Sequence, residues 1–271
     1  MIGGIYLLLL GLKTSIDHKQ LFDRIRHQPD IVELHTFDKD YTGNRLINLE
    51  KTIEYLKSRG IEVLVHGPLT LSGEAIGGLH FKKKLRAFYH YSATVLSEVA
   101  KKFNVNIVIH PNYKRDLLLK RTELKQGVIE LMDEYDELSG GRFLWENDTK
   151  GIFSFGNPDF LDTFFPNGRK MCFDTLHALV SLNGNNEKMF EEIEKAKDNI
   201  KHFHLIDSMG LKHDSLQIGK GIIDWKKMMP YLTEDRTYVF EIDLPNQTNC
   251  IEMLLSYEYL KQVKQTKETS S

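Results

Sequence analysis

The sequence predicts a single (β/α)8 TIM barrel, and three observations support that fold class. Short apolar segments typical of buried strands recur along the chain, and each is followed by a longer segment with helical periodicity, which is the pattern of a parallel sheet. Eight such apolar segments can be counted, and seven consecutive ones end in at least one His, Asp or Glu. The length of 271 residues is within the range of one such barrel.

The expected strands alternate with the expected outer helices along the whole chain. The strands are expected at residues 4–10, 31–35, 62–66, 106–110, 142–147, 170–174, 200–206 and 237–242. Amphipathic segments at 48–59, 85–103, 124–138 and 187–198 have apolar residues three and four positions apart and predict helices. Gly60 is typical of a helix C-cap, and residues 158–165 predict a short helix capped by Asn157.

The domain organisation follows from the lack of any linker between these segments. We expect one barrel over residues 1–260 and a flexible tail over residues 261–271, where the apolar content falls. A hydrophobic share of 41% and a charged share of 27% are ordinary for a globular protein. The net charge of -2 lacks the basic excess of a dedicated nucleic-acid binder, so any affinity for DNA would be local.

The cysteine content and the hydropathy predict a cytoplasmic protein. Only Cys172 and Cys250 are present, too few for a disulfide framework, which indicates a reducing compartment. No apolar run approaches the ~20 residues of a membrane span. The apolar residues near the start lack the basic region and cleavage site of a signal peptide, so we assign them to the first strand.

Ionisable residues at the strand ends are the main functional signal. Because side chains alternate along a strand, residues such as Glu146 and Asp174 are expected to point into the barrel at its C-terminal mouth, where barrel active sites lie. The set consists of Glu33, His35, His66, His110, Glu146, Asp174, His204 and Glu241. Glu33 and His35 are expected to orient the others by hydrogen bonds, whereas His80, His90 and His202 are interpreted as structural.

Such a cluster predicts bound divalent metal ions. Unpaired charges and imidazoles gathered in one mouth would each cost several kcal/mol of desolvation unless cations neutralised them. Mixed imidazole and carboxylate ligands favour Zn2+, or else Mn2+, over the oxygen-preferring Mg2+ and Ca2+. His177, three positions after Asp174, adds another imidazole close to the same cluster.

Six short motifs give the chain a resemblance to a known group of proteins. They are VHGP at 65–68, IHPN at 109–112, WEN at 145–147, FDTLHA at 173–178, HLIDS at 204–208 and IGKGIIDW at 218–225. In this order, at or just after successive strand ends, they resemble the AP endonuclease family 2 and xylose isomerase-like barrels. The resemblance spans roughly residues 2–255.

The resemblance implies a ligand set of two or three ions. Glu146, Asp174, His204 and Glu241 match the metal quartet shared by the whole superfamily, its sugar isomerases and epimerases included. His66 and His110 match the pair that, in members similar to endonuclease IV, holds a further ion together with Glu146. His177 matches a ligand of a third ion.

The third ion site departs from the family pattern. The loop at 209–217 is short, and Ser215 stands where the family usually has His, so that His213 is the nearest candidate ligand. The expected third site is therefore altered or absent. Leu69 replaces a tyrosine, and the first strand lacks the family's early histidine.

Two reaction classes remain open at this point. The leading hypothesis is a hydrolase for DNA repair that cuts DNA 5′ to abasic sites. In this reaction a water activated between two ions attacks phosphorus, Glu146 bridges the ions, and Glu241 orients the water. The alternative is an isomerase or epimerase for a small sugar or sugar phosphate, in which Glu146 and Glu241 transfer a proton. A barrel that only binds a ligand explains the cluster poorly. The residues do not indicate an oligomeric state.

Overall fold

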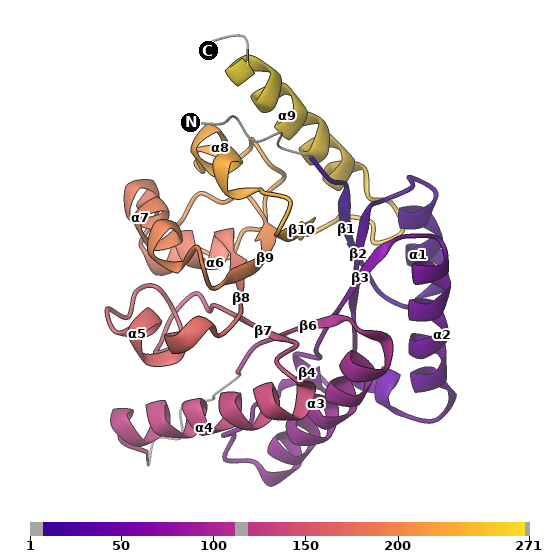
Figure 1. Cartoon of the computed structure of the whole chain (residues 1–271), viewed down its shortest axis with the longest axis vertical. Helices are drawn as coiled ribbons and strands as arrows, with labels where there is room; N and C mark the ends of the chain where they lie inside the picture. The colour runs from indigo at the N-terminus through magenta and orange to yellow at the C-terminus, as the bar shows by residue number, and fades with distance from the viewer. Residues whose placement is uncertain (1–7, 112–118, 269–271) are drawn as a thin grey trace.

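Eight parallel strands form a closed barrel with helices outside it, which confirms the predicted fold class (Figure 1). The structure is a computed structural model and describes residues 8–111 and 119–268. Around the barrel the strands follow the order β1-β10-β9-β8-β7-β6-β3-β2. Their bounds are β1 Gly11–Thr14, β2 Ile31–His35, β3 Glu62–His66, β6 Asn106–Ile109, β7 Phe143–Glu146, β8 Met171–Asp174, β9 Ile200–Leu205 and β10 Thr237–Phe240.

The outer helices are α1 His18–Ile25, α2 Asn44–Ser58, α3 Lys83–Phe103, α4 Arg121–Ser139, α5 Phe160–Phe164, α6 Thr175–Ser181, α7 Asn186–Ala196, α8 Trp225–Met228 and α9 Ile251–Glu268. Short 3-10 turns lie at Asp38–Tyr41, Pro166–Gly168 and Met229–Tyr231, and a small hairpin pairs β4 Thr70–Leu71 with β5 Glu74–Ala75.

The four predicted amphipathic segments correspond to α2, α3, α4 and α7. The short helix expected at 158–165 is α5, but its N-cap is Asp159 and not Asn157. The C-cap of α2 is Arg59, and Gly60, the residue after it, has a φ of 76°, the left-handed conformation typical of a glycine that follows a helix.

The first strand is the main correction to the expected elements. We expected it at residues 4–10, but residues 4–7 lie outside the described part of the chain and the strand is Gly11–Thr14. A β-carbon on Gly11 would collide with the Tyr238 carbonyl oxygen, so the close approach of β1 to β10 requires glycine there. The shift places Lys13 on the barrel strand instead of in the loop after it.

The barrel interior has an apolar lower layer and a polar upper layer. Six residues, one from each of six strands, form an apolar cluster separate from the main core: Ile31, Leu64, Val108, Leu144, Cys172 and Val239. Two positions further along the same strands stand Glu33, His66, His110, Glu146, Asp174 and Glu241. Because residues two positions apart on a strand point to the same face, the ionisable residues that we expected to point into the barrel lie on the same side as this cluster.

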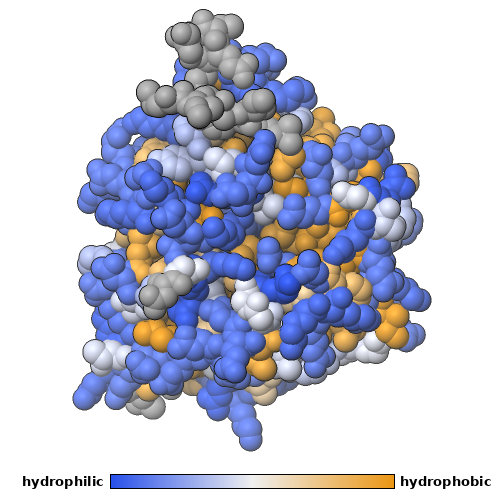
Figure 2. Space-filling view, viewed as in Figure 1, coloured by the Kyte–Doolittle hydropathy of each residue, from blue (hydrophilic) through white to orange (hydrophobic). Residues whose placement is uncertain are grey.

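The larger core fills the space between the strands and the helices. Its cluster includes Trp145 and Phe173 from the outward faces of the strands, and Leu96 and Met132 from the helices. Hydrophilic side chains cover most of the face shown in Figure 2, and apolar residues show through in smaller patches. Helix α9 continues to Glu268, beyond residue 260 where we expected the barrel to end, and Val263 packs in the core.

None of the helices among the described residues is both long and apolar enough to cross a membrane.

Candidate metal centre

The candidate metal ligands converge at the C-terminal ends of neighbouring strands. Within each of two groups, one ligand atom from every residue lies within 4.8 Å of the others. The first group comprises Glu146, Asp174, His204 and Glu241, and the second comprises His66, His110 and Glu146. The structure therefore brings six of the eight predicted ligands together, with Glu146 common to both groups.

The two oxygens of Glu146 face different sets of imidazoles. Its Oε2 lies 3.1 Å from His66 Nε2 and 3.0 Å from His110 Nε2. Its Oε1 lies 3.3 Å from His204 Nδ1 and 3.4 Å from His177 Nδ1. One buried carboxylate thus presents one oxygen to His66 and His110 and the other to His204 and His177, so Glu146 could contribute to holding ions in both groups.

Backbone and carboxylate acceptors fix which ring nitrogen of each histidine faces Glu146. His66 Nδ1 lies 2.7 Å from the Gly67 carbonyl oxygen, and His110 Nδ1 lies 3.4 Å from Asp148 Oδ1. When these Nδ1 atoms donate, both Nε2 atoms are left as ligands. Asp148 was not among the predicted site residues, although it directly follows the WEN motif.

Glu33 is the acceptor that fixes which ring nitrogen of His204 faces the cluster. Its Oε2 lies 3.0 Å from His204 Nε2 and 3.1 Å from His202 Nε2, so His204 presents Nδ1 to the cluster. The expectation that Glu33 orients other groups therefore agrees with its contacts. His202, interpreted from the sequence as structural, shares this acceptor and also lies 2.6 Å from Thr237 Oγ1.

The buried polar atoms of this site fit a divalent cation. His204 Nδ1 and Glu241 Oε2 are buried, and neither has a hydrogen-bond partner of acceptable geometry among the described residues. They are only 2.5 Å apart. A buried ring nitrogen and carboxylate oxygen this close together are a donor set that a divalent cation such as Zn2+ accepts.

Asp174 contributes one oxygen to the cluster and uses the other to cap a helix. Its Oδ1 accepts a hydrogen bond of 2.6 Å from the His177 backbone at the start of α6, whereas Oδ2 lies 3.8 Å from His204 Nδ1. Asn147 holds the two strand ends together, because its Oδ1 accepts from the Asp174 backbone at 2.9 Å. The WEN and FDTLHA motifs therefore hold Asp174 so that only Oδ2 faces the other candidate ligands.

Lys13 is the functional residue that the sequence analysis missed. Its ammonium lies 3.0 Å from Glu33 Oε1 and 2.6 Å from Glu241 Oε1, and its side chain is 9% exposed. Burial would lower the pKa of Lys13, but Glu241 and Glu33 raise it, so the group stays charged. Placing the first strand at residues 4–10 had hidden this cation.

Carboxylates and imidazoles shift each other's pKa in opposite directions. Burial alone would raise the pKa of Glu146, but His110 and His204 hold it well below its usual range. Burial alone would lower the pKa of His110, but Glu146 and Asp148 raise it to about 10. Without ions, therefore, protons on His110 and His204, whose pKa values are raised, offset the charge of the carboxylates.

This coupling predicts a characteristic pH dependence for the protein stripped of metal. A group whose pKa is raised by folding stabilises the folded protein fully when the pH is below the pKa of that group in the unfolded chain, which is about 6.5 for His. This stabilisation is lost as the pH rises through the pKa of the group in the folded protein. Since the folded pKa of His110 is about 10, we expect the melting temperature of chelator-treated protein to fall by several degrees between these two values.

Differential scanning fluorimetry across that range measures the effect. In zinc-loaded protein the stabilisation by the ion is expected to grow with pH instead, since binding displaces protons from the same imidazoles. His110→Gln should flatten the profile of the stripped protein. A melting temperature that rises between neutral and alkaline pH in the stripped protein would contradict the assignment.

The third ion site is incomplete among the described residues. His177 Nδ1 lies 2.8 Å from the Asn147 carbonyl oxygen, and the His213 ring centroid is 5.2 Å from that of His177. His213 is exposed, and its Nδ1 lies 3.3 Å from Ser215 Oγ. The two histidines are neighbours, as expected, but they belong to no group of three close ligands within residues 8–111 and 119–268.

The IGKG motif forms a turn around a buried carboxylate. Asp207 accepts hydrogen bonds from the Gly219 backbone at 2.8 Å, the Ile223 backbone at 3.2 Å and the Trp225 indole at 2.9 Å. A β-carbon on Gly221 would collide with Asp207 and Ser208. The glycine therefore serves close packing of the turn. Asn112, which ends the IHPN motif, lies outside the described residues.

Two further clusters of ligand-type residues are poor cation sites. Cys172 lies near His202 and His204, but burial raises the pKa of its thiol, so it stays protonated. Asp23, His27 and Cys250 form the other cluster, in which Arg24 Nη1 lies 2.9 Å and Arg26 Nη2 2.7 Å from the Asp23 carboxylate. These two arginines already neutralise the carboxylate.

Fold and site together define a (β/α)8 barrel with clustered imidazole and carboxylate ligands at its mouth. The chain belongs to the xylose isomerase-like TIM barrel family, whose sequence profile matches residues 25–261. This confirms the resemblance drawn from the motifs. A comparison with curated proteins gives no significant match.

Solved structures of similar fold include proteins with different names. A D-tagatose 3-epimerase-like protein has a TM-score of 0.74 at 18% identity, covering 97% of this chain and 100% of its own. A Thermus thermophilus protein soaked with ZnCl2 has a TM-score of 0.65 at 16% identity, covering 94% and 97%. An AP endonuclease, family 2, from Brucella melitensis has a TM-score of 0.63 at 14% identity, covering 89% and 95%. At these identities the likeness shows the fold alone.

Proposed function

We propose that the protein is a metal-dependent phosphodiesterase that cuts DNA on the 5′ side of abasic sites, with zinc or manganese ions held in two groups that share Glu146. The observation that carries the proposal is the division of the Glu146 oxygens between His66 and His110 on one side and His204 on the other. A proton-transfer reaction on a small sugar gives His66 and His110 no obvious task.

The residues divide the work of this reaction between binding and positioning. Bound ions would lower the pKa of a water and offset negative charge on the phosphoryl oxygens. Glu241 has one oxygen 2.6 Å from Lys13 Nζ and the other beside His204, so it is held in place to orient the attacking water. Glu33 and Asp148 keep His204 and His110 in the orientation that ligation needs.

Three residues of the early mouth loops differ in how far they could contact DNA. Leu69, at the position of the family's tyrosine, is 39% exposed and remains available to contact a nucleotide. Tyr41 is not available for such a contact, because it is buried with its hydroxyl 2.8 Å from Thr36 Oγ1. Arg45 is paired with Asp40 at 3.0 Å.

A sugar isomerase or epimerase is the second candidate function. The observation in its favour is that Glu146 and Glu241 both flank His204 Nδ1, at 3.3 and 2.5 Å, so two carboxylates can face one substrate carbon. This chemistry needs one ion, held by the quartet. The number of ions required for turnover therefore separates the two candidates.

Incubation with an end-labelled duplex that carries one abasic site tests the proposal. We expect zinc- or manganese-loaded protein to nick the duplex 5′ to the lesion, and a chelator to abolish nicking. Glu241→Gln should lower the rate by at least about 100-fold, because the activated water loses its positioning carboxylate. Glu98→Gln, on the exposed side of α3, is the matched control and should nick normally.

Folded, metal-loaded protein that leaves the abasic duplex intact would contradict the proposal. A panel of aldoses and ketoses would then be tested with the same preparations. Sugar turnover that is lost in Glu241→Gln would establish the second candidate.

A further inference from the structure

Four ionisable side chains form a closed ring where the first and last strands of the barrel meet. Lys13 comes from β1, Glu33 from β2 and His204 from β9, and Glu241 directly follows β10. The Lys13 ammonium lies 3.0 Å from Glu33 Oε1 and 2.6 Å from Glu241 Oε1. The His204 ring lies 3.0 Å from Glu33 Oε2 and 2.5 Å from Glu241 Oε2. Each carboxylate therefore presents one oxygen to the ammonium and the other to the imidazole.

The register of the strands places the ammonium in this ring. On β1, Lys13 is paired with Glu33 of β2. The preceding residue, Leu12, is paired with Phe240 of β10, which comes directly before Glu241. The contacts that close the barrel therefore also hold Lys13 between the two carboxylates.

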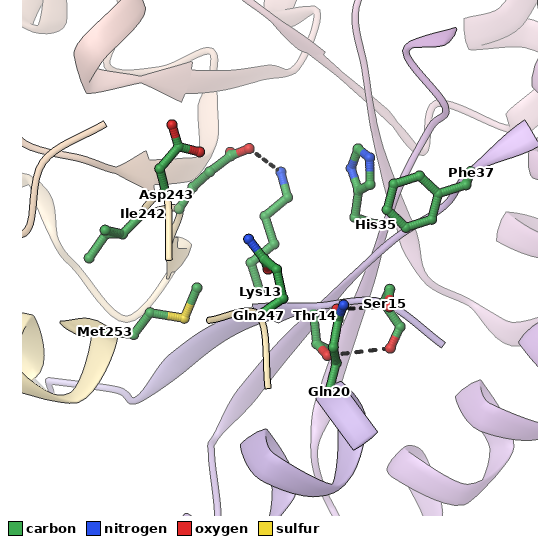
Figure 3. A pocket seen from close by; sticks show the side chains of 11 residues that line it. Lys13, Thr14, Ser15, Gln20, His35, Phe37, Ile242, Asp243, Gln247 and Met253 are labelled. Atoms are coloured by element: carbon green, nitrogen blue, oxygen red, sulfur yellow. Dashed lines mark hydrogen bonds and ion pairs between the residues drawn. The ribbon is translucent and has the colours of Figure 1, made fainter. Parts of the chain in front are cut away.

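Lys13 also lies between the ring and a cavity of about 400 Å3 at the ends of β1, β2 and β10 (Figure 3). Lys13 and Glu241 line the cavity near the ring, and Gln20 and Gln247 line it further out. The dashed line from Lys13 in Figure 3 marks its ion pair with Glu241. Glu33 is fully buried, contacts Lys13 and is not one of the lining residues. The ammonium therefore lies between this buried carboxylate and the cavity.

The ring limits what Glu241 can offer to a metal ion. Its Oε1 faces the Lys13 ammonium, so Oε2, beside His204 Nδ1, is the oxygen that an ion could use. A carboxylate that binds through one oxygen, together with an imidazole, suits the tetrahedral ligand set of Zn2+. An ion such as Mn2+ prefers an octahedral set rich in carboxylate and water oxygens. The ion pair with Lys13 thus favours the ion that needs fewer oxygen ligands.

We infer that Lys13 is a positioning residue that makes the metal group containing Glu241 prefer zinc to manganese. Lys13 acts through Glu241, because it occupies Oε1 and keeps Oε2 directed towards the cation. The inference rests on the metal centre of the proposed function and not on its substrate. It therefore applies to a phosphodiesterase and to an isomerase alike.

Metal titration of the full-length protein tests this role without any substrate. His66→Gln/His110→Gln is the parent protein, because it leaves the group with Glu241 as the one predicted ion site. Chelator-stripped protein is titrated with ZnCl2 and with MnCl2 by calorimetry. In Lys13→Met we expect the zinc affinity to fall by about tenfold, because Glu241 loses the partner that orients it. The manganese affinity should not fall, because Oε1 becomes a further oxygen ligand.

Two further variants separate the position of Glu241 from charge and from folding. Lys13→Met/Glu33→Gln removes one positive and one negative charge, leaves no unpaired Glu33 carboxylate, and keeps an acceptor for His204. It should show the same loss of zinc preference as Lys13→Met. Lys13→Arg keeps a cation beside Glu241 and should keep most of the preference. Lys19→Met, exposed on α1, is the matched control and should bind both ions like the parent.

An unchanged ratio of zinc to manganese affinity in folded Lys13→Met or in Lys13→Met/Glu33→Gln overturns the inference, as does an equal loss of preference in Lys19→Met. Circular dichroism checks that each variant is folded. Nicking of abasic DNA by the wild type is read separately. Protein that nicks but shows an unchanged ratio contradicts the role of Lys13 alone, and a lowered ratio without nicking contradicts the proposed function alone. A parent protein that binds neither ion contradicts both.

Discussion

Glu146→Gln is expected to have the largest effect of any single substitution in this protein, because it removes a ligand from both groups at once. The two Glu146 oxygens face His66 and His110 on one side and His204 on the other. A neutral amide keeps the shape but removes the charge that offsets the cations. We expect bound metal to fall from two ions per chain to at most one, and turnover to fall by at least about 1000-fold.

Elemental analysis after dialysis, together with the nicking assay, measures both effects. Glu98→Gln controls for the loss of a surface carboxylate and should keep both ions. Two ions retained in Glu146→Gln would show that Glu146 does not connect the groups.

The double substitution His66→Gln/His110→Gln addresses the second ion by itself. We expect it to lower the metal content by one ion and leave the Asp174, His204 and Glu241 site intact. A phosphodiesterase that uses both ions should then lose activity by about 100-fold or more. Unchanged turnover would support the isomerase candidate, in which one ion is enough.

Glu33→Leu is expected to weaken the protein and the metal centre by separable mechanisms. Its loss leaves the Lys13 ammonium with one partner fewer and leaves His204 Nε2 without its acceptor. Breaking a buried pair costs about 3–5 kcal/mol of unfolding free energy. Loss of the acceptor behind a ligating histidine lowers metal affinity by about 10- to 100-fold.

The second substitution Lys13→Met separates these two consequences. In Lys13→Met/Glu33→Leu no buried ammonium is left, so we expect urea unfolding to recover most of the lost stability. The metal affinity should remain low, because His204 still lacks its acceptor and Glu241 has also lost its Lys13 partner. Glu62→Leu, at the exposed start of β3, is the control and should change stability by no more than about 0.5 kcal/mol. Recovery of metal affinity in the double variant would refute the role assigned to Glu33.

The sequence alone determined the barrel and the strand ends at which the candidate ligands lie. Period-two alternation predicted that Cys172 and Asp174 share a face, and the structure places Cys172 in the apolar cluster inside the barrel. Short motifs at the strand ends predicted which residues meet, because the carboxyl ends of parallel strands in a closed barrel must come together. These features depend on local periodicity, which a sequence displays directly.

Only the tertiary structure decided how the ligands are supported and what lies beside them. Lys13 was missed because the first strand is the short segment GLKT at Gly11–Thr14. The apolar residues before it have a more typical strand pattern, so the strand was predicted there. Asp148 and the cavity at Gln20 and Gln247 depend on contacts between residues distant in the chain or in loops. Sequence spacing does not encode such contacts, since the direction of a side chain at a loop or strand end depends on which elements pack around it.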